Sequence, residues 1–113
     1  MTPEQKQQLR EKVVQERARL ARDIESLKEL TRPVAPGADS LDEVSRMDAI
    51  QNKSVNEAAL ATSRSRLAGM EYALKRLDDD DPEFGYCVDC GEPIPFARLM
   101  SMPEASRCVN CAD

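Results

Sequence analysis

Four cysteines near the C-terminus are the residues whose types and spacing most clearly indicate chemistry in this sequence. They form two pairs, each with two residues between its members, and seventeen residues separate the pairs: Cys87 and Cys90, then Cys108 and Cys111. A two-residue gap lets both thiolates of a pair turn toward one tetrahedral ion. We therefore predict that the four side chains bind one structural Zn²⁺ ion.

The rest of the composition narrows the chemistry of this site. The chain contains no histidine, so the fourth ligand must be cysteine. A closed four-cysteine site leaves no coordination position for water, which makes its metal structural rather than catalytic. A pair of disulfides or an iron–sulfur cluster is the alternative use of the same cysteines. We expect no enzyme, because the sequence lacks a nucleophile with an evident base and a glycine-rich phosphate loop.

Aromatic content and charge indicate a small module on a polar appendage. Among 113 residues there are two Phe, two Tyr and no Trp, and 33% of the residues are charged. Zinc would supply stability that burial alone cannot give to so small a core. The formal net charge of −5 argues against the duplex-DNA backbone as the main partner.

The N-terminus and the cysteine usage favour a cytoplasmic protein. Residues 1–5 show no charged segment followed by an apolar one, so we recognise no secretory signal. Cysteines in a chain without an export signal are more often metal ligands than disulfides. No apolar run approaches the roughly 20 residues of a membrane span, so we expect no membrane contact.

Two long helical segments precede the cysteines. The first is expected over about residues 3–31 and the second over about 40–78. The turn between them, at about 32–39, contains two prolines and a glycine within five residues. Apolar residues recur at heptad positions in both segments: Leu9, Val13, Leu20, Leu27 and Leu30 in the first, and Leu60, Leu67, Met70, Leu74 and Leu77 in the second.

The fold class predicted from this pattern is mainly α. Residues 1–81 would form a long antiparallel coiled-coil helical hairpin, and residues 82–113 a small zinc-finger module with four cysteine ligands. The acidic run 78–81 would end the second helix and serve as a solvated hinge. We expect the longer second helix to extend past the first at the end away from the turn. An intermolecular coiled coil is the alternative, but the turn favours an intramolecular hairpin and a monomer.

A specific pattern surrounds the cysteines: Phe84-Gly85-Tyr86-Cys87-x-x-Cys90-Gly91, followed by Ile94, Arg98-Leu99, Pro103, Ala105 and Cys108-x-x-Cys111. This pattern resembles the zinc finger of the DksA/TraR family of bacterial transcription regulators. The hairpin before it is similar to that of the DksA branch in architecture more than in sequence. Members of the family bind RNA polymerase directly, without recognising a promoter sequence, and insert the coiled coil into its secondary channel.

The resemblance implies a non-enzymatic regulator of transcription initiation. RNA polymerase is the implied partner, the alarmone ppGpp is an implied co-regulator, and no sequence-specific DNA binding is expected. Arg98 is kept from the family pattern and becomes a candidate polymerase or alarmone contact. Its alternative role is an ion pair with an acidic residue of the finger or of the run 78–81.

The tip of the hairpin departs from the family pattern. The DksA branch carries an Asp-x-x-Asp-x-Ala signature there; in this chain Asp42 keeps the first Asp, whereas Ser45 and Met47 replace the second Asp and the Ala. Residues three or four apart share one helix face. We predict a partner-binding tip formed by Asp42, Ser45, Arg46, Asp48 and Ala49, although Asp42 also suits an ordinary first helical turn.

The C-terminus departs as well. The sequence ends two residues after Cys111, where the DksA branch continues into a C-terminal helix. The resemblance therefore does not extend to contacts and alarmone sensitivity that depend on that helix or on a longer N-terminal segment.

A second hypothesis is a zinc-ribbon adaptor that binds another protein or a nucleic acid. Arg98 and Arg107 are the only positive side chains of the finger, which lacks the basic cluster with interleaved aromatics that nucleic-acid binding favours. The four-cysteine site could also be redox-sensitive, because thiol oxidation releases zinc and would unfold the finger. Such sensitivity could coexist with polymerase binding.

Overall fold

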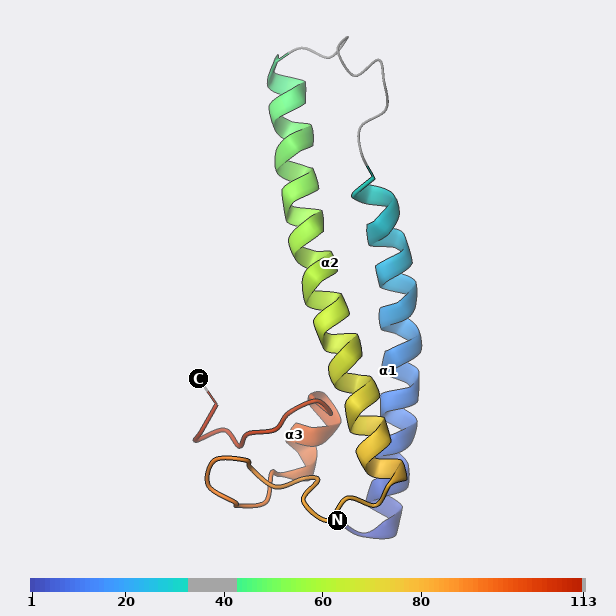
Figure 1. Cartoon of the computed structure of the whole chain (residues 1–113), viewed down its shortest axis with the longest axis vertical. Coiled ribbons are helices and arrows are strands. Elements are labelled where there is room, and N and C mark those ends of the chain that lie inside the picture. The colour runs from blue at the N-terminus through green and yellow to red at the C-terminus, as the bar shows by residue number, and fades with distance from the viewer. Residues whose placement is uncertain (33–42, 113) are drawn as a thin grey trace.

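A computed structural model of the chain describes residues 1–32 and 43–112. The molecule is an elongated helical hairpin of 60 × 27 × 18 Å with a small C-terminal module beside one end (Figure 1). The predicted mainly α fold class is confirmed. The described part contains one isolated β-bridge, between Tyr86 and Pro93, and no regular strand. None of the described helices is long and apolar enough to cross a membrane.

Helix α1 spans Pro3–Leu30 and begins with a capping box formed by Thr2 and Gln5. The Gln5 N–H donates to Thr2 Oγ1 at 3.1 Å, and the Thr2 N–H donates to Gln5 Oε1 at 3.0 Å. Pro3 occupies the first helical position, where a missing N–H removes no helical hydrogen bond. These local contacts fix where α1 starts.

The buried stripe of α1 differs from the heptad stripe predicted for it. Leu9, Val13, Leu20 and Ile24 are buried, whereas Leu27 is half-buried and Leu30 is 60% exposed. The buried residues repeat after eleven positions, a spacing that follows a nearly straight helix of 3.6 residues per turn rather than a heptad. Ile24 is therefore the last buried residue of the stripe, whereas the heptad pattern had predicted Leu27 and Leu30 in the core.

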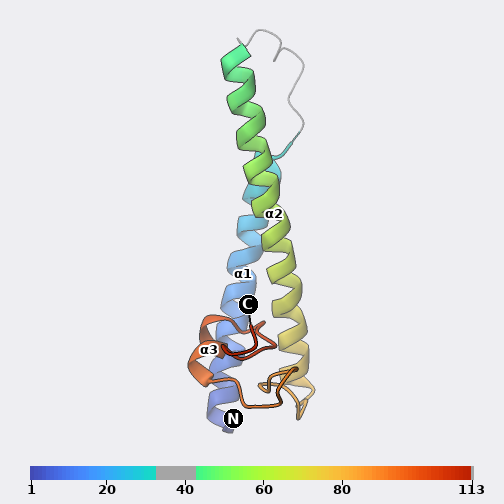
Figure 2. The same cartoon turned by 90° about the vertical axis from the view of Figure 1, so that its left-hand side faces the viewer.

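Helix α2 spans Glu43–Asp78 and presents two faces to the rest of the molecule. One face carries the predicted stripe, of which Met70, Leu74 and Leu77 lie in one hydrophobic cluster with buried residues of α1, while Leu67 packs against this cluster. The other face lies against the C-terminal module. Figure 2 shows this module alongside the base of both helices. The same cluster includes Phe84, Ile94 and Leu99 of the module, so a single core joins all three parts.

At the base, beside the C-terminal module, the last residue of α2 lies next to Arg10, and the first turns of α1 reach past it. Arg10 Nε lies 2.8 Å from Asp78 Oδ1, and Lys6 Nζ lies 3.8 Å from Asp80 Oδ1. Because α2 has 36 residues and α1 has 28, α2 continues past Leu30 at the opposite end (Figure 1). The prediction that the second helix extends past the first at the end away from the turn was wrong, since these ion pairs place the end of α2 beside the first turns of α1. Met70, Leu74 and Leu77 of α2 nevertheless pack in one cluster with the module.

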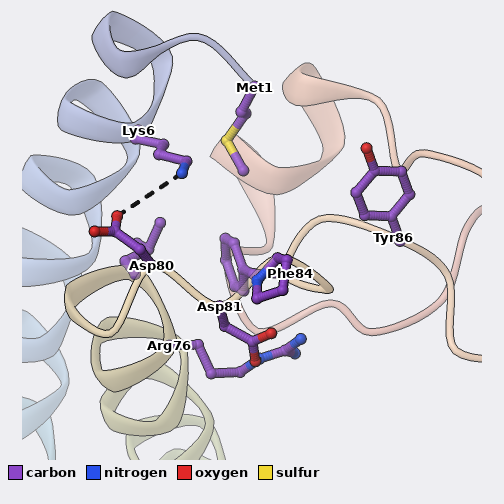
Figure 3. A pocket seen from close by; sticks show the side chains of 9 residues that line it. Met1, Lys6, Arg76, Asp80, Asp81, Phe84 and Tyr86 are labelled. Carbon is purple, nitrogen blue, oxygen red and sulfur yellow. Dashed lines mark hydrogen bonds and ion pairs between the residues drawn. The ribbon is translucent and has the colours of Figure 1, made fainter.

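The acidic run 78–81, which follows the predicted end of the second helix, forms a set of contacts across the base that we call the clasp, and its role as a hinge stays a prediction. Asp81 accepts hydrogen bonds from the Glu83 N–H at 2.9 Å and from Arg76 Nε at 2.7 Å, and these two contacts lower the pKa of its carboxyl. Figure 3 shows Arg76 and Asp81 beside the ring of Phe84, whose centroid is 5.2 Å from the guanidinium carbon. The run thus holds the end of α2, the start of α1 and the first residues of the module together.

The division of the chain into separate units at residues 81 and 82 stays a prediction. The predicted turn at 33–39 and the cap at Ser40 lie outside the described residues.

Replacing Leu9 by alanine should lower the free energy of unfolding by about 2–5 kcal/mol, because the change leaves a cavity at a fully buried position. Ile50 is the control, since its side chain is 65% exposed on α2 and Ile50→Ala should change stability by less than about 0.5 kcal/mol. Chemical denaturation of the zinc-loaded protein, followed by circular dichroism, measures both. Equal losses from the two substitutions would contradict the core described above.

Candidate metal centre

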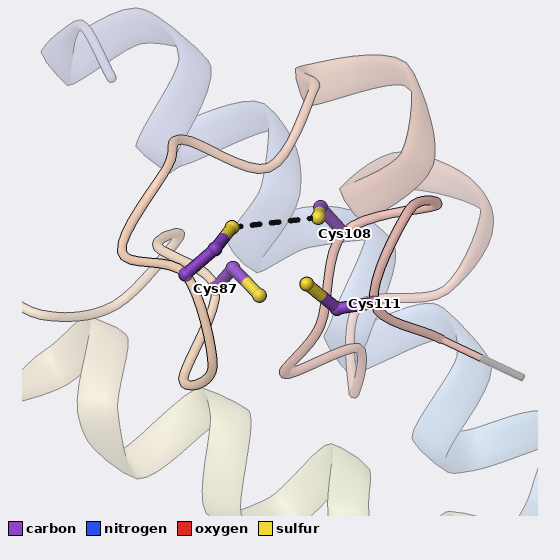
Figure 4. A group of neighbouring side chains, drawn as sticks. Cys87, Cys108 and Cys111 are labelled. Carbon is purple, nitrogen blue, oxygen red and sulfur yellow. Dashed lines mark hydrogen bonds between the residues drawn. The ribbon is translucent and has the colours of Figure 1, made fainter.

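Four cysteine sulfurs meet beside the base of the hairpin. Those of Cys87, Cys90, Cys108 and Cys111 all lie within 4.8 Å of one another, and the four thiols are free of disulfides. Figure 4 shows the side chains converging from the two knuckles. The sulfurs of Cys90 and Cys108 are 3.7 Å apart. A tetrahedral ion with metal–sulfur bonds of about 2.3 Å requires about 3.8 Å between ligands, so the spacing suits zinc.

Backbone hydrogen bonds shape each knuckle. The Cys87 carbonyl accepts a hydrogen bond from the Gly91 N–H at 2.9 Å, and the Cys108 carbonyl accepts one from the Ala112 N–H at 2.9 Å. Gly91 has φ +75°, in the left-handed region that glycine enters without steric cost. The glycine after the first pair therefore closes its turn, as the sequence pattern indicated.

Contacts between the knuckles keep the two pairs facing each other. The Val88 N–H donates to the carbonyl oxygen of Ser106 at 2.9 Å. One residue further along each segment, Arg107 Nε lies 2.8 Å from Asp89 Oδ2. These contacts hold the two knuckles face to face around the four sulfurs.

The sulfur cluster resists full ionisation unless a cation is present. Backbone N–H groups of Cys108 and Cys90 point at the sulfur of Cys87 and lower the pKa of that thiol to about 6. In contrast, hydrogen bonding with the sulfurs of Cys108 and Cys87 raises the pKa of Cys111 to about 12. One thiolate forms readily, but further negative charge is opposed by its neighbours. A divalent cation removes this repulsion.

The donor set fits zinc in number, softness and geometry. Four thiolates around one point are the ligands of a structural zinc site, which has no open position for a reacting molecule. When bound, the ion balances the charge of the sulfurs and cross-links the two knuckles. The residues themselves supply the fold that brings the sulfurs together.

Residues 82–113 match the family described as the prokaryotic dksA/traR C4-type zinc finger. The C-terminal module of this chain is therefore similar to that zinc finger, and the match covers only these residues of the chain. Together with the four converging sulfurs, this match confirms the predicted cofactor, one structural zinc ion.

Curated proteins similar to this chain include two RNA polymerase-binding transcription factors named DksA. The protein from Haemophilus influenzae is 46% identical over 48 residues, which cover 42% of this chain and 32% of the relative. The protein from Escherichia coli K12 is 40% identical over 48 residues, covering 42% of this chain and 30% of the relative. The match thus spans about a third of the length of these relatives.

A solved structure extends the similarity to the hairpin. The transcription factor DksA2 from Pseudomonas aeruginosa aligns with a TM-score of 0.68 at 24% sequence identity, covering 97% of this chain and 81% of that chain. At this identity the comparison supports the fold. The combination of a helical hairpin and a terminal finger is therefore shared between the two proteins.

The predicted tip residues are only partly within the described structure. Asp42 lies outside the described residues. Ser45, Arg46, Asp48 and Ala49 belong to the first turns of α2, but their side chains also lie outside the described part. The partner-binding tip therefore stays a prediction.

Arg98 lies in helix α3, which spans Phe96–Ser101. Its Nε donates to the carbonyl oxygen of Arg107 at 3.1 Å, so it ties α3 to the second knuckle. Within the described residues this bond takes the place of the ion pair proposed for Arg98 as an alternative role. A polymerase or alarmone contact by Arg98 stays a prediction.

Acidification should remove metal from the site, because protons compete with the ion for the sulfurs. Cobalt-substituted protein should lose its sulfur-to-metal absorption bands as the solution is taken from about pH 8 to about pH 5. Once the metal has left, the raised pKa of Cys111, about 12, keeps its thiol protonated, which opposes rebinding of the ion.

Circular dichroism of the same samples separates metal loss from unfolding of the long helices. Cobalt bands that persist unchanged at the acidic end of the titration would contradict an all-thiolate site.

Proposed function

We propose that this chain binds RNA polymerase directly and regulates transcription initiation, with the far end of its hairpin inserted into the secondary channel. The observation that carries the proposal is the combination of a DksA/TraR-family finger with a narrow helical rod. The printed names of the curated relatives, RNA polymerase-binding transcription factors, support this choice of partner. The chain acts on the polymerase without catalysing a reaction of its own.

The shape of the rod supports entry into a confined channel. At about 1.5 Å per residue, α2 is roughly 54 Å long, and its first turns extend beyond α1. Among the side chains described there, Met47, Ile50 and Val55 are all more than half exposed. Exposed apolar side chains on a projecting helix can contact the surface of another protein without any rearrangement of this chain's hydrophobic core.

Charge and packing support the remaining parts of the proposal. A net charge of −5 favours a protein surface over the DNA backbone as the main partner. The apolar stripes of α1 and α2 are buried against each other within one chain, so we propose a monomer. A polymerase partner places the protein in the cytoplasm.

The proposed division of labour assigns docking to the base and regulation to the tip. The zinc finger and the clasp form a rigid base, because they share one core with both helices. Asp42 and the group Ser45, Arg46, Asp48 and Ala49 would then act near the active centre. A carboxylate at this position could approach the catalytic magnesium, a cation that prefers oxygen ligands.

Site-specific photocrosslinking tests the orientation of the rod. A photoreactive residue at position 47 should crosslink to polymerase segments that line the secondary channel. Position 72 is the matched control, since Met47 and Tyr72 are each 63% exposed but lie at opposite ends of α2. Crosslinks from position 72 should fall outside the channel. Channel crosslinks from position 72 in place of position 47 would contradict insertion of the tip.

Substitutions in the tip test the regulatory role. Asp42→Asn, or alanine at Ser45, Arg46 and Asp48 together, should change open-complex lifetime severalfold while leaving affinity for core polymerase within about twofold, because the base supplies docking. Purified transcription and polymerase pull-down assays measure these two quantities. A normal lifetime with both variants would show that the tip was assigned incorrectly.

The alarmone is tested separately with Arg98→Ala. If Arg98 contributes to ppGpp sensitivity, the effect of ppGpp on open-complex lifetime should shrink while the effect of the protein alone persists. Equal ppGpp responses of the two proteins would remove Arg98 from the proposal.

A further inference from the structure

The face of α2 that meets the finger consists of small and cationic residues. Arg66, Gly69, Ala73 and Arg76 recur every three or four positions and so share one side of the helix. Arg66 Nε lies 3.3 Å from Glu104 Oε1, and the guanidinium of Arg76 lies over the ring of Phe84. Gly69 lies between these two contacts. These four residues lie outside the apolar heptad stripe of α2, so the heptad pattern did not predict this second face.

Gly69 is placed where a helix ordinarily disfavours glycine. Glycine in a helix interior is less favourable than alanine, since it loses more backbone freedom on folding. The backbone does not demand glycine at this position, because positive φ among the described glycines is confined to Gly85 and Gly91. The reason is steric: a Cβ at position 69 would lie 2.9 Å from Glu104 Cβ and 3.5 Å from Glu104 Cγ.

Glu104 is held so that it cannot easily move away from α2. It follows Pro103, which is fully buried and has a fixed φ, in a turn closed by the Ala105 N–H donating to the Met102 carbonyl at 2.9 Å. One carboxylate oxygen of Glu104 pairs with Arg66, and the other is buried without a hydrogen-bond partner among the described residues. A clash with Glu104 would therefore move the finger as a unit.

We propose that Gly69 is the seat of the zinc finger: contact between Glu104 and the bare backbone at this position sets the orientation of the finger on the rod. Arg66 and Arg76 hold the finger on either side of the seat, and Gly69 sets how closely it approaches. A partner that grips the finger would thereby fix the direction of the far end of α2. Only this last consequence rests on the proposed function.

The sign of one substitution tests the seat. In an ordinary helix Gly→Ala raises stability, but in zinc-loaded full-length protein Gly69→Ala should lower the melting temperature by about 5 °C, because the new Cβ overpacks the contact. Ser65→Ala, at an exposed position of the same helix, is the control and should leave the melting temperature unchanged or slightly higher. An unchanged or raised melting temperature for Gly69→Ala would overturn the proposal.

A second background ties the effect to Glu104. Glu104→Gly removes both atoms that a Cβ at position 69 would meet, so Gly69→Ala should cost little or nothing in that background. An equal loss in both backgrounds would overturn the seat. Residual dipolar couplings should also reveal a tilt of the finger relative to α2 in Gly69→Ala, and an unchanged orientation would count against the proposal. None of these measurements involves polymerase, so they stand or fall independently of the proposed function.

Discussion

Four sulfurs held within 4.8 Å of one another impose the constraint on which the C-terminal module depends. The backbone brings them together, and the first thiolate is stabilised by N–H groups, yet neighbouring sulfurs oppose further ionisation. A bound zinc ion would remove this repulsion between thiolates, because its positive charge and its four bonds to sulfur stabilise all of them. The module has little regular structure beyond α3, so its order rests on the ion, the knuckle hydrogen bonds and contact with the hairpin.

The metal centre is coupled to the rod through burial. Cys87 and Cys108 lie in the same hydrophobic cluster as Leu9 of α1 and Met70 of α2. Any change that disorders the knuckles therefore exposes part of the core that joins the two helices. The clasp at 78–81 adds ion pairs around this core, but its side chains are largely exposed, and exposed pairs contribute little individually. Burial and zinc, rather than the charges, carry most of the stability of the base.

The far end of the hairpin has a different character. Its described apolar residues are exposed, and the buried stripe of α2 begins only at Leu60. A helix that projects without a packed partner depends on its own propensity and hydrogen bonds. The molecule thus combines a base stabilised by a shared core with a far end whose described apolar side chains are exposed.

The sequence by itself determined the zinc ligands, the helical class and the similarity of residues 82–113 to a known zinc finger, because the cysteine spacing, the glycine after the first pair and the capping box each act within a few residues. The stripe of α2 was also predictable, since helix periodicity follows from the backbone. The tertiary structure decided how the ends of the two helices are aligned, why Leu30 is exposed, and why glycine stands at position 69. These features depend on contacts between distant segments, such as Arg10 with Asp78. Local periodicity carries no information about such contacts, because the same stripe can pack in several registers.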